Sequence, residues 1–130
     1  MRVLVCGGRD FSDRKLPCDT LDALAREHDD QTLCVVHGMA DGADALAGEW
    51  ARSTGHWQMC VRAMWEEHGK KAGPLRNQRM LDEAKPHLVL AFPGGRGTAD
   101  LVRRAEAAGV PVRHIQLLPV DSTDGNLTRK

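Results

Sequence analysis

The sequence predicts an α/β domain built on a parallel sheet, and two observations carry this prediction. Five short apolar runs recur along the 130 residues, and most of them do not alternate with polar residues, as expected of strands covered on both faces. Stretches with helical spacing separate the runs, so strands and helices alternate along the chain. We therefore expect a three-layer sandwich with a five-stranded parallel sheet of order 3-2-1-4-5.

Each element has a recognisable sequence pattern. Pro74 suits the first position of the third helix, and Pro86 prevents that helix from continuing. Gly109 closes the fourth helix as a C-terminal cap. The expected helices span 16–28, 41–55, 73–84 and 97–109. The expected strands are RVLVC, LCVVH, WQMCV, HLVLAF and VRHIQLL, at 2–6, 33–37, 57–61, 87–92 and 112–118.

Composition narrows the class of protein. The 18 basic and 18 acidic residues cancel, so no broad positive field would attract nucleic acid or an anionic membrane. The chain has neither an apolar run of membrane-spanning length nor a signal peptide, so we expect a cytoplasmic protein. Its four cysteines form no CxxC pair, and Cys6, Cys34 and Cys60 lie in apolar runs, so we expect buried free thiols with no metal and no cofactor. One domain is expected at 1–118 and a polar tail at 119–130.

Glycine-rich segments follow three of the expected strands. They are GGRDF, HGMADGAD and PGGRGTAD, after the first, second and fourth strands. The carboxyl ends of parallel strands meet at one edge of the sheet, and ligands bind there at the point where the strand order reverses. In the order 3-2-1-4-5 this point lies between strands one and four, the two that are followed by Gly-Gly. The pattern predicts a ligand site at this edge.

The segment PGGRGT has the composition of a phosphate-binding loop. Glycine lets backbone N–H groups approach an anion without a Cβ in the way, and a helix N-terminus adds unpaired N–H groups. A tight structural turn is the alternative for any single loop, but three such loops at one edge favour a ligand. Neither GxxxxGK[ST] nor the standard dinucleotide fingerprint is present. The residues predicted to hold the phosphate are Gly94, Gly95, Gly97 and Thr98.

Polar residues at the same edge are further candidates for ligand binding. Arg9 could pair with a phosphate, and Asp10 could accept a hydrogen bond from a ribose hydroxyl. Asp44 suits either a ligand or the start of a helix. His37 suits either a ligand or a hydrogen bond to neighbouring backbone. The full set of these candidates is Gly7, Gly8, Arg9, Asp10, His37, Gly38, Asp44, Arg76 and Asn77.

The tryptophans and the segment 64–74 complete the pattern. This segment is expected to be a long, charged loop. Trp65 could stack on a base or pack beneath the loop, and Lys70 or Lys71 could reach a phosphate from a lid. Trp50 and Trp57 are expected to pack against the core.

Four ordered blocks of sequence carry a resemblance to a known family. VCGGRDF, HGMADGADALAGEWA, HGKKAGPLRNQRML and FPGGRGTADLVRRA resemble the SLOG superfamily of Rossmann-like proteins, which bind nucleotides and related ligands. The chain looks closest to the YspA, cpYpsA-related branch. The resemblance implies a Rossmann-like fold, a homodimer and a ligand such as an ADP-ribose or NAD derivative or a nucleoside phosphate.

The same superfamily contains phosphoribohydrolases, once called lysine decarboxylases, which carry PGGxGTxxE. They hydrolyse the N-glycosidic bond of cytokinin nucleoside monophosphates with that glutamate and an upstream arginine. Here Leu101 occupies the glutamate position, with Asp100 one residue earlier, and Arg76 is the candidate arginine.

The expected function is therefore capture or sensing of a nucleotide-derived small molecule. The alternative is an enzyme, a nucleoside 5′-monophosphate N-glycosidase with Asp100 and Arg76 as catalytic residues. Binding of single-stranded DNA is less favoured, because the sequence shows no basic stripe lined with aromatic residues.

Overall fold

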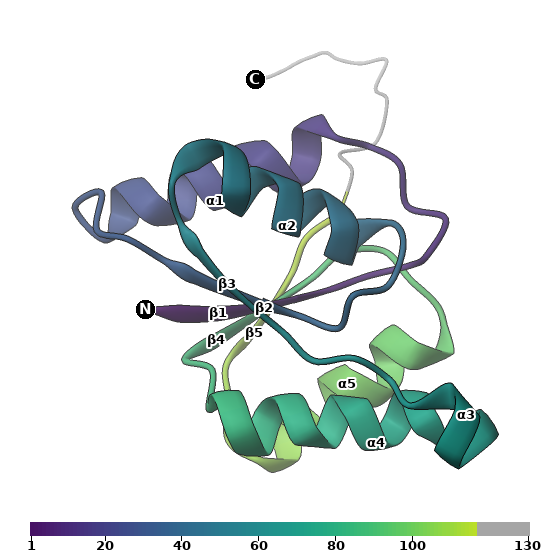
Figure 1. The fold of residues 1–130 in the computed structure, drawn as a ribbon. Helices are drawn as coiled ribbons and strands as arrows, with labels where there is room; N and C mark the ends of the chain where they lie inside the picture. The colour runs from purple at the N-terminus through teal and green to yellow at the C-terminus, as the bar shows by residue number, and fades with distance from the viewer. Residues whose placement is uncertain (117–130) are drawn as a thin grey trace, which may run out of the picture.

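The computed structural model describes residues 1–116, which form a five-stranded sheet between two layers of helices (Figure 1). Neighbouring strands pair in parallel throughout, in the order β3-β2-β1-β4-β5. The predicted fold class and strand order are thereby confirmed. The predicted tail, and the last two residues of the expected fifth strand, lie outside the described residues. The strands are β1 (Arg2–Cys6), β2 (Cys34–His37), β3 (Trp57–Cys60), β4 (Leu88–Ala91) and β5 (Val112–His114).

Two helices cover each face of the sheet. In Figure 1, α1 (Lys15–Glu27) and α2 (Ala43–Thr54) lie on one side, and α4 (Ala72–Arg79) and α5 (Arg96–Ala107) lie on the other. A π-helical turn, η2 (Met80–Ala84), continues α4. No helix within residues 1–116 is long and apolar enough to cross a membrane.

Alternation along β1 divides the core between the two faces. Val3 and Val5 belong to the apolar cluster that contains α1 and α2 residues, whereas Leu4 and Cys6 belong to the cluster beneath η2 and α5. Successive side chains of a strand point to opposite faces, which explains this division. Cys6, the last residue of β1, consequently faces the α4–α5 side at the carboxyl edge of the sheet.

The segment 64–74 is helical rather than a loop, so that expectation was wrong. It contains α3 (Trp65–His68) and the 3₁₀ turn η1 (Gly69–Lys71), which leads directly into α4. Two acidic residues in the first turn of α3 complement the helix dipole. Gly69, with φ of 55°, then redirects the chain. Because α4 begins at Ala72, Pro74 is its third residue, still within the first turn.

The edge position of β3 explains two further differences. Trp57 is 72% exposed, although it was expected to pack, and Cys60 is exposed at the other end of the strand. Only one neighbouring strand pairs with β3, and less of its surface is covered than that of β1 or β4. Trp50 is buried as expected, and its Nε1 donates to Asp22 Oδ1 at 2.9 Å.

Candidate functional site

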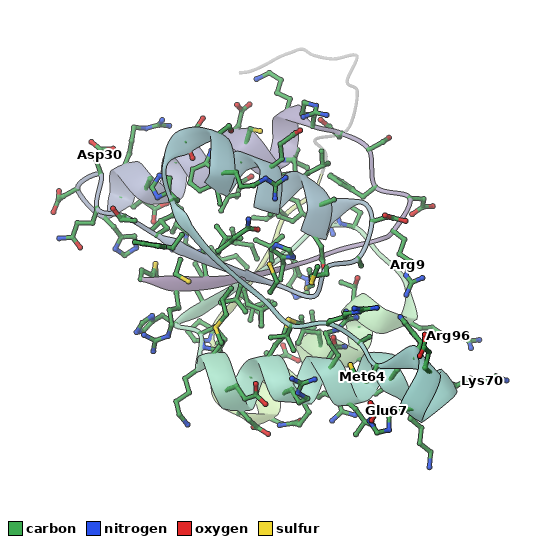
Figure 2. The ribbon with its side chains drawn as sticks, viewed as in Figure 1. Arg9, Asp30, Met64, Glu67, Lys70 and Arg96 are labelled. Atoms are coloured by element: carbon green, nitrogen blue, oxygen red, sulfur yellow. The ribbon has the colours of Figure 1, made fainter. Side chains whose placement is uncertain are left out.

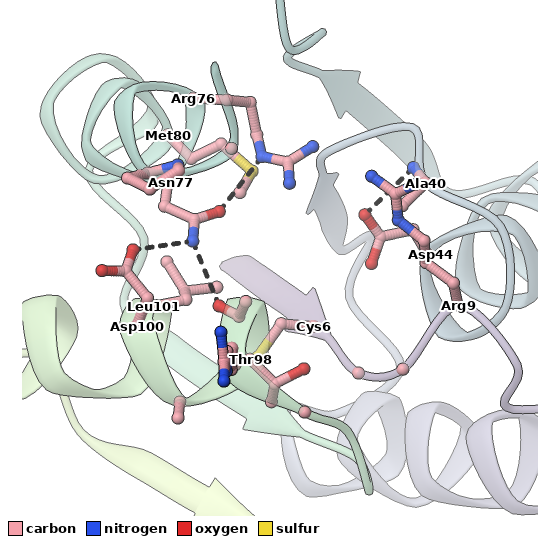
Figure 3. A pocket seen from close by; sticks show the side chains of 18 of the residues that line it. Cys6, Arg9, Ala40, Asp44, Arg76, Asn77, Met80, Thr98, Asp100 and Leu101 are labelled. Atoms are coloured by element: carbon pink, nitrogen blue, oxygen red, sulfur yellow. Dashed lines mark hydrogen bonds between the residues drawn. The ribbon is translucent and has the colours of Figure 1, made fainter. Parts of the chain in front are cut away.

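A cavity of about 750 Å³ opens at the carboxyl edge of the sheet, next to β1 and β4, where the strand order reverses (Figure 3). The segment after β1, the start of α2, the first turns of α4 and the N-terminus of α5 all contribute to its wall. The glycine-rich segments supply Gly7, Gly8, Arg9, Asp10, Asp44, Gly95, Gly97, Thr98 and Asp100. From α4 come Arg76 and Asn77.

The N-terminus of α5 presents unpaired backbone donors to this cavity. The first bond of the helix runs from Ala99 N to Gly95 O at 3.0 Å, so the preceding N–H groups of the first turn have no partner within the helix. Gly95 caps the helix without any side-chain hydrogen bond. A Cβ added at Gly95 or Gly97 would meet no atom within 4 Å. Open space therefore lies over the end of the helix where an anion binds best.

Gly94 serves packing instead. It lines a neighbouring cavity rather than the main one, and a Cβ there would collide with Thr98 Oγ1 and with Gly8 N. The two glycine segments approach closely at this point, because Gly8 N donates to Pro93 O at 2.8 Å. The tight-turn interpretation therefore describes Gly94, while Gly95 and Gly97 leave the loop open.

His37 and Gly38 also lie outside the main cavity. The Nδ1 atom of His37 accepts from Met39 N at 3.1 Å. Since a backbone N–H can only donate, Nε2 carries the ring proton and donates to Gln58 Oε1 at 2.8 Å. Protein groups thus satisfy both ring nitrogens. Cys60 Sγ lies 3.3 Å from the protonated Nε2, so His37 cannot act as its base.

Asp44 braces the segment after β2 from a buried position. Its Oδ2 accepts from Gly38 N at 2.8 Å and from Ala40 N at 3.3 Å. Burial raises the pKa of Asp44, and these two hydrogen bonds, with the nearby His37 and Arg76, partly oppose that rise. This carboxylate therefore shapes the wall of the cavity through the backbone.

Asp44→Ala is expected to lower the free energy of unfolding by roughly 1–3 kcal/mol, because two backbone donors lose their acceptor. Asp41→Ala is the matched control, since Asp41 is exposed and α2 has no side-chain cap. Urea denaturation of the two variants and of the unmodified protein measures the difference. Equal losses in the two variants would contradict the bracing role.

Asp100 lies in the cavity wall, but other side chains occupy its oxygens. Oδ2 accepts from Asn77 Nδ2 at 3.0 Å (Figure 3). Oδ1 also accepts from Arg103 Nη2 at 2.8 Å, and Oδ2 from Arg104 Nε at 2.9 Å. Burial acts to raise the pKa of Asp100, but these hydrogen bonds and the two guanidinium charges outweigh it and hold the pKa below its ordinary value. Asp100 is therefore a paired carboxylate that ties α5 to α4.

Asp100→Asn is expected to cost about 1 kcal/mol of stability near neutral pH. The pKa of Asp100 is lower in the folded state than in the unfolded chain, so its contribution is complete above the unfolded value of about 3.9. The contribution disappears as the pH falls through the folded value. Urea unfolding at several pH values measures the difference, with Glu106→Gln as the control on the same helix. A difference that persists in strong acid would contradict this origin.

The neighbouring Leu101 is almost fully buried in the apolar cluster beneath α5, and it also lines the floor of the cavity. The position that carries glutamate in the phosphoribohydrolase pattern is thus apolar.

The cavity is positively charged although the chain is neutral. Asp44 and Asp100 are engaged by backbone or side-chain donors, which leaves Asp10 as the exposed carboxylate of the lining. Figure 2 shows Arg9, Lys70 and Arg96 gathered at the α3 end of the molecule. The cations of the lining that form no ion pair within residues 1–116 are Arg9, Lys70, Arg76 and Arg96.

The candidate set from the sequence lacked several lining residues. Arg96 is the variable position of PGGRGT and the first residue of α5, so its place in the motif could have identified it. Cys6 could have been found from alternation along β1. Burial raises the pKa of its thiol to about 12, with Asp44 adding to this effect, so the floor carries a neutral thiol. Arg103 faces the cavity two turns into α5.

A protein family and a related phage protein both match the sequence of this chain. The YspA, cpYpsA-related SLOG family matches residues 1–68. The Gene 61 protein of Mycobacterium phage D29 is 45% identical over 119 residues, which cover 85% of this chain and 93% of that protein.

Two solved structures share the fold at low sequence identity. DNA processing protein A (DprA) from Streptococcus pneumoniae superposes with a TM-score of 0.72 at 21% identity, over 92% of this chain. The chain spans about half of the length of DprA, 52%. TM1055 superposes with a TM-score of 0.67 at 23% identity, and the match covers 85% of this chain and 71% of the TM1055 chain. With the phage relative and the family match over its first 68 residues, this chain belongs to the YspA, cpYpsA-related SLOG family.

Proposed function

We propose that the chain captures a nucleotide-derived small molecule in the main cavity, as a sensor or ligand-binding domain. The observation that carries this proposal is the open N-terminus of α5, where N–H groups without a partner in the helix face a cavity whose cations Arg9, Lys70, Arg76 and Arg96 form no ion pair within residues 1–116. A phosphate group satisfies both features at once, because helix N-termini and guanidinium groups are its usual partners. Membership of the SLOG family fits a nucleotide-related function.

The proposed roles follow from position in the cavity. The phosphate lies over Gly95, Gly97 and Thr98, where the Thr98 hydroxyl adds a donor. Arg76 faces it from α4, held in place because its Nη1 donates to Gly38 O at 2.6 Å and its Nε to Asn77 Oδ1 at 3.1 Å. Asp10, the exposed carboxylate, is suited to accept hydrogen bonds from ribose hydroxyls.

Hydrolysis of the ligand is not the function that these residues favour. A carboxyl group that acts as general acid or base needs an oxygen free to face the reacting bond, and the oxygens of Asp100 already accept from three side chains. Leu101 carries no titratable group. Single-stranded DNA is also not favoured, because Trp65 is the one aromatic side chain among the described residues of the lining.

Identification of the ligand tests the proposal directly. Protein purified under native conditions is denatured, and the released small molecules are identified by mass spectrometry. Isothermal titration calorimetry with AMP then measures binding to ligand-free protein. A released nucleotide or measurable AMP binding supports the proposal, whereas the absence of both contradicts it.

Arg76→Gln is expected to weaken nucleotide binding roughly 10-fold to 100-fold, because a charge-assisted hydrogen bond contributes about 1.5–3 kcal/mol. Arg79→Gln is the matched control, since Arg79 lies on the same helix, pairs with Glu83 and does not line the cavity. Calorimetry measures the affinities, and circular dichroism verifies the fold. Equal affinity of the two variants would place the phosphate away from α4.

A further inference from the structure

A second, smaller chamber of about 260 Å³ adjoins the main cavity at the ends of β2 and β3. Three guanidinium groups line it, from Arg9, Arg62 and Arg76, together with one carboxylate, Asp41. Two of its arginines, Arg9 and Arg76, line the main cavity as well. The two chambers therefore meet between these side chains.

The arginines of the second chamber have unused donors. The Nη1 and Nε atoms of Arg76 donate hydrogen bonds to protein oxygens. Its Nη2 forms no hydrogen bond within residues 1–116. In the same part of the chain, Arg62 forms neither a side-chain hydrogen bond nor an ion pair. Arg9 lies 5.3 Å from the centre of the Trp65 ring, a cation–π contact that leaves its N–H groups available.

The positive charges of Arg9 and Arg76 also repel each other. Burial lowers the pKa of Arg76, Asp44 acts against this, and the positive charge of Arg9 lowers it further. An anion that contacts both guanidinium groups offsets the electrostatic repulsion between them.

The two chambers are separated along the sheet. The loop at the N-terminus of α5 follows β4, and the second chamber lies at the ends of β2 and β3. In the order β3-β2-β1-β4-β5, strands β4 and β2 are two positions apart, which corresponds to about 10 Å. A single phosphate at α5 therefore cannot also occupy the second chamber.

We infer that the second chamber is an anion subsite, and that the ligand is a nucleotide with two phosphate groups, one over the first turn of α5 and the other among Arg9, Arg62 and Arg76. This inference rests on the proposed function, because it assigns the first phosphate to the same loop. Arg62 is the residue that separates the two sites, since it lines the second chamber and not the main cavity.

Calorimetry at constant ionic strength with AMP, ADP and adenosine 3′,5′-bisphosphate tests the inference. ADP, whose two phosphates share one oxygen and cannot span the two chambers, is the control for added charge. Adenosine 3′,5′-bisphosphate, whose phosphates are attached to separate carbons of the ribose, is expected to bind roughly 10-fold to 100-fold more tightly than AMP. Arg62→Gln is expected to remove most of that gain and to leave the affinity for AMP unchanged. Arg26→Gln, at an exposed position near the end of α1, is the control for the loss of one charge.

Three outcomes would overturn the inference. If AMP binds and adenosine 3′,5′-bisphosphate binds no more tightly than AMP or ADP, the second subsite is absent while the proposed function stands. If Arg62→Gln weakens the binding of AMP and of adenosine 3′,5′-bisphosphate by the same factor, Arg62 does not contact a second phosphate. The same conclusion follows if the variant still binds the bisphosphate more tightly than AMP by the original factor. If none of the three probes binds, the inference fails, and the proposed function fails with it when the native protein also releases no nucleotide.

Discussion

Gly95→Val is expected to abolish nucleotide binding, with a loss of at least roughly 100-fold in affinity, while the protein stays folded. A Cβ at Gly95 meets no protein atom within 4 Å, so the valine side chain projects into the space above the first turn of α5. There it blocks the approach of a phosphate to the backbone N–H groups. The loss of two or more charge-assisted hydrogen bonds accounts for this magnitude.

The fold should tolerate this substitution. No protein atom obstructs a Cβ at Gly95, and the poorer N-cap costs about 1 kcal/mol. Ala107→Val, at an exposed position of α5, is the control for a β-branched residue in this helix. Calorimetry on both folded variants gives the result. Unchanged affinity in Gly95→Val would mean that the glycines only shape the turn.

Incubation with AMP or its N6-substituted analogues is expected to release little or no free base. Positioned acid–base groups typically contribute about 10²–10⁴-fold to rate, and the chain has no free carboxylate at either candidate position. Leu101 is apolar and buried, and Asp100 is held ionised by Asn77 and two arginines. Turnover should therefore fall by at least that factor below that of a dedicated hydrolase.

Chromatography of long incubations with several nucleoside monophosphates measures the released base. Accumulation with ordinary enzymatic turnover, stopped by Asp100→Asn while binding persists, would show that the protein is an N-glycosidase. Glu106→Gln is again the control, because Glu106 lies on α5 and lines only the neighbouring cavity.

The fold and the location of the site could be predicted because both depend on local patterns. Continuous apolar runs mark buried strands, and glycine and proline mark the ends of helices. Gly-Gly after the first and fourth strands indicated the edge where the strand order reverses, and the cavity opens there. The segment 64–74 was misjudged because its two glycines suggested a loop, whereas Gly69 begins the 3₁₀ turn η1 and Gly73 lies within α4.

The sequence by itself determined the parallel α/β sheet, its order and the glycine loop at its edge. Only the tertiary structure decided which polar side chains remain free. Asp100 is engaged because α4 brings Asn77 to it across 23 residues, and His37 is engaged because β3 brings Gln58 beside β2. Periodicity specifies which face of an element a residue occupies, but the atom opposite it belongs to another element. The hydrogen bonds that separate a structural carboxylate from a reactive one are therefore set only when the elements pack.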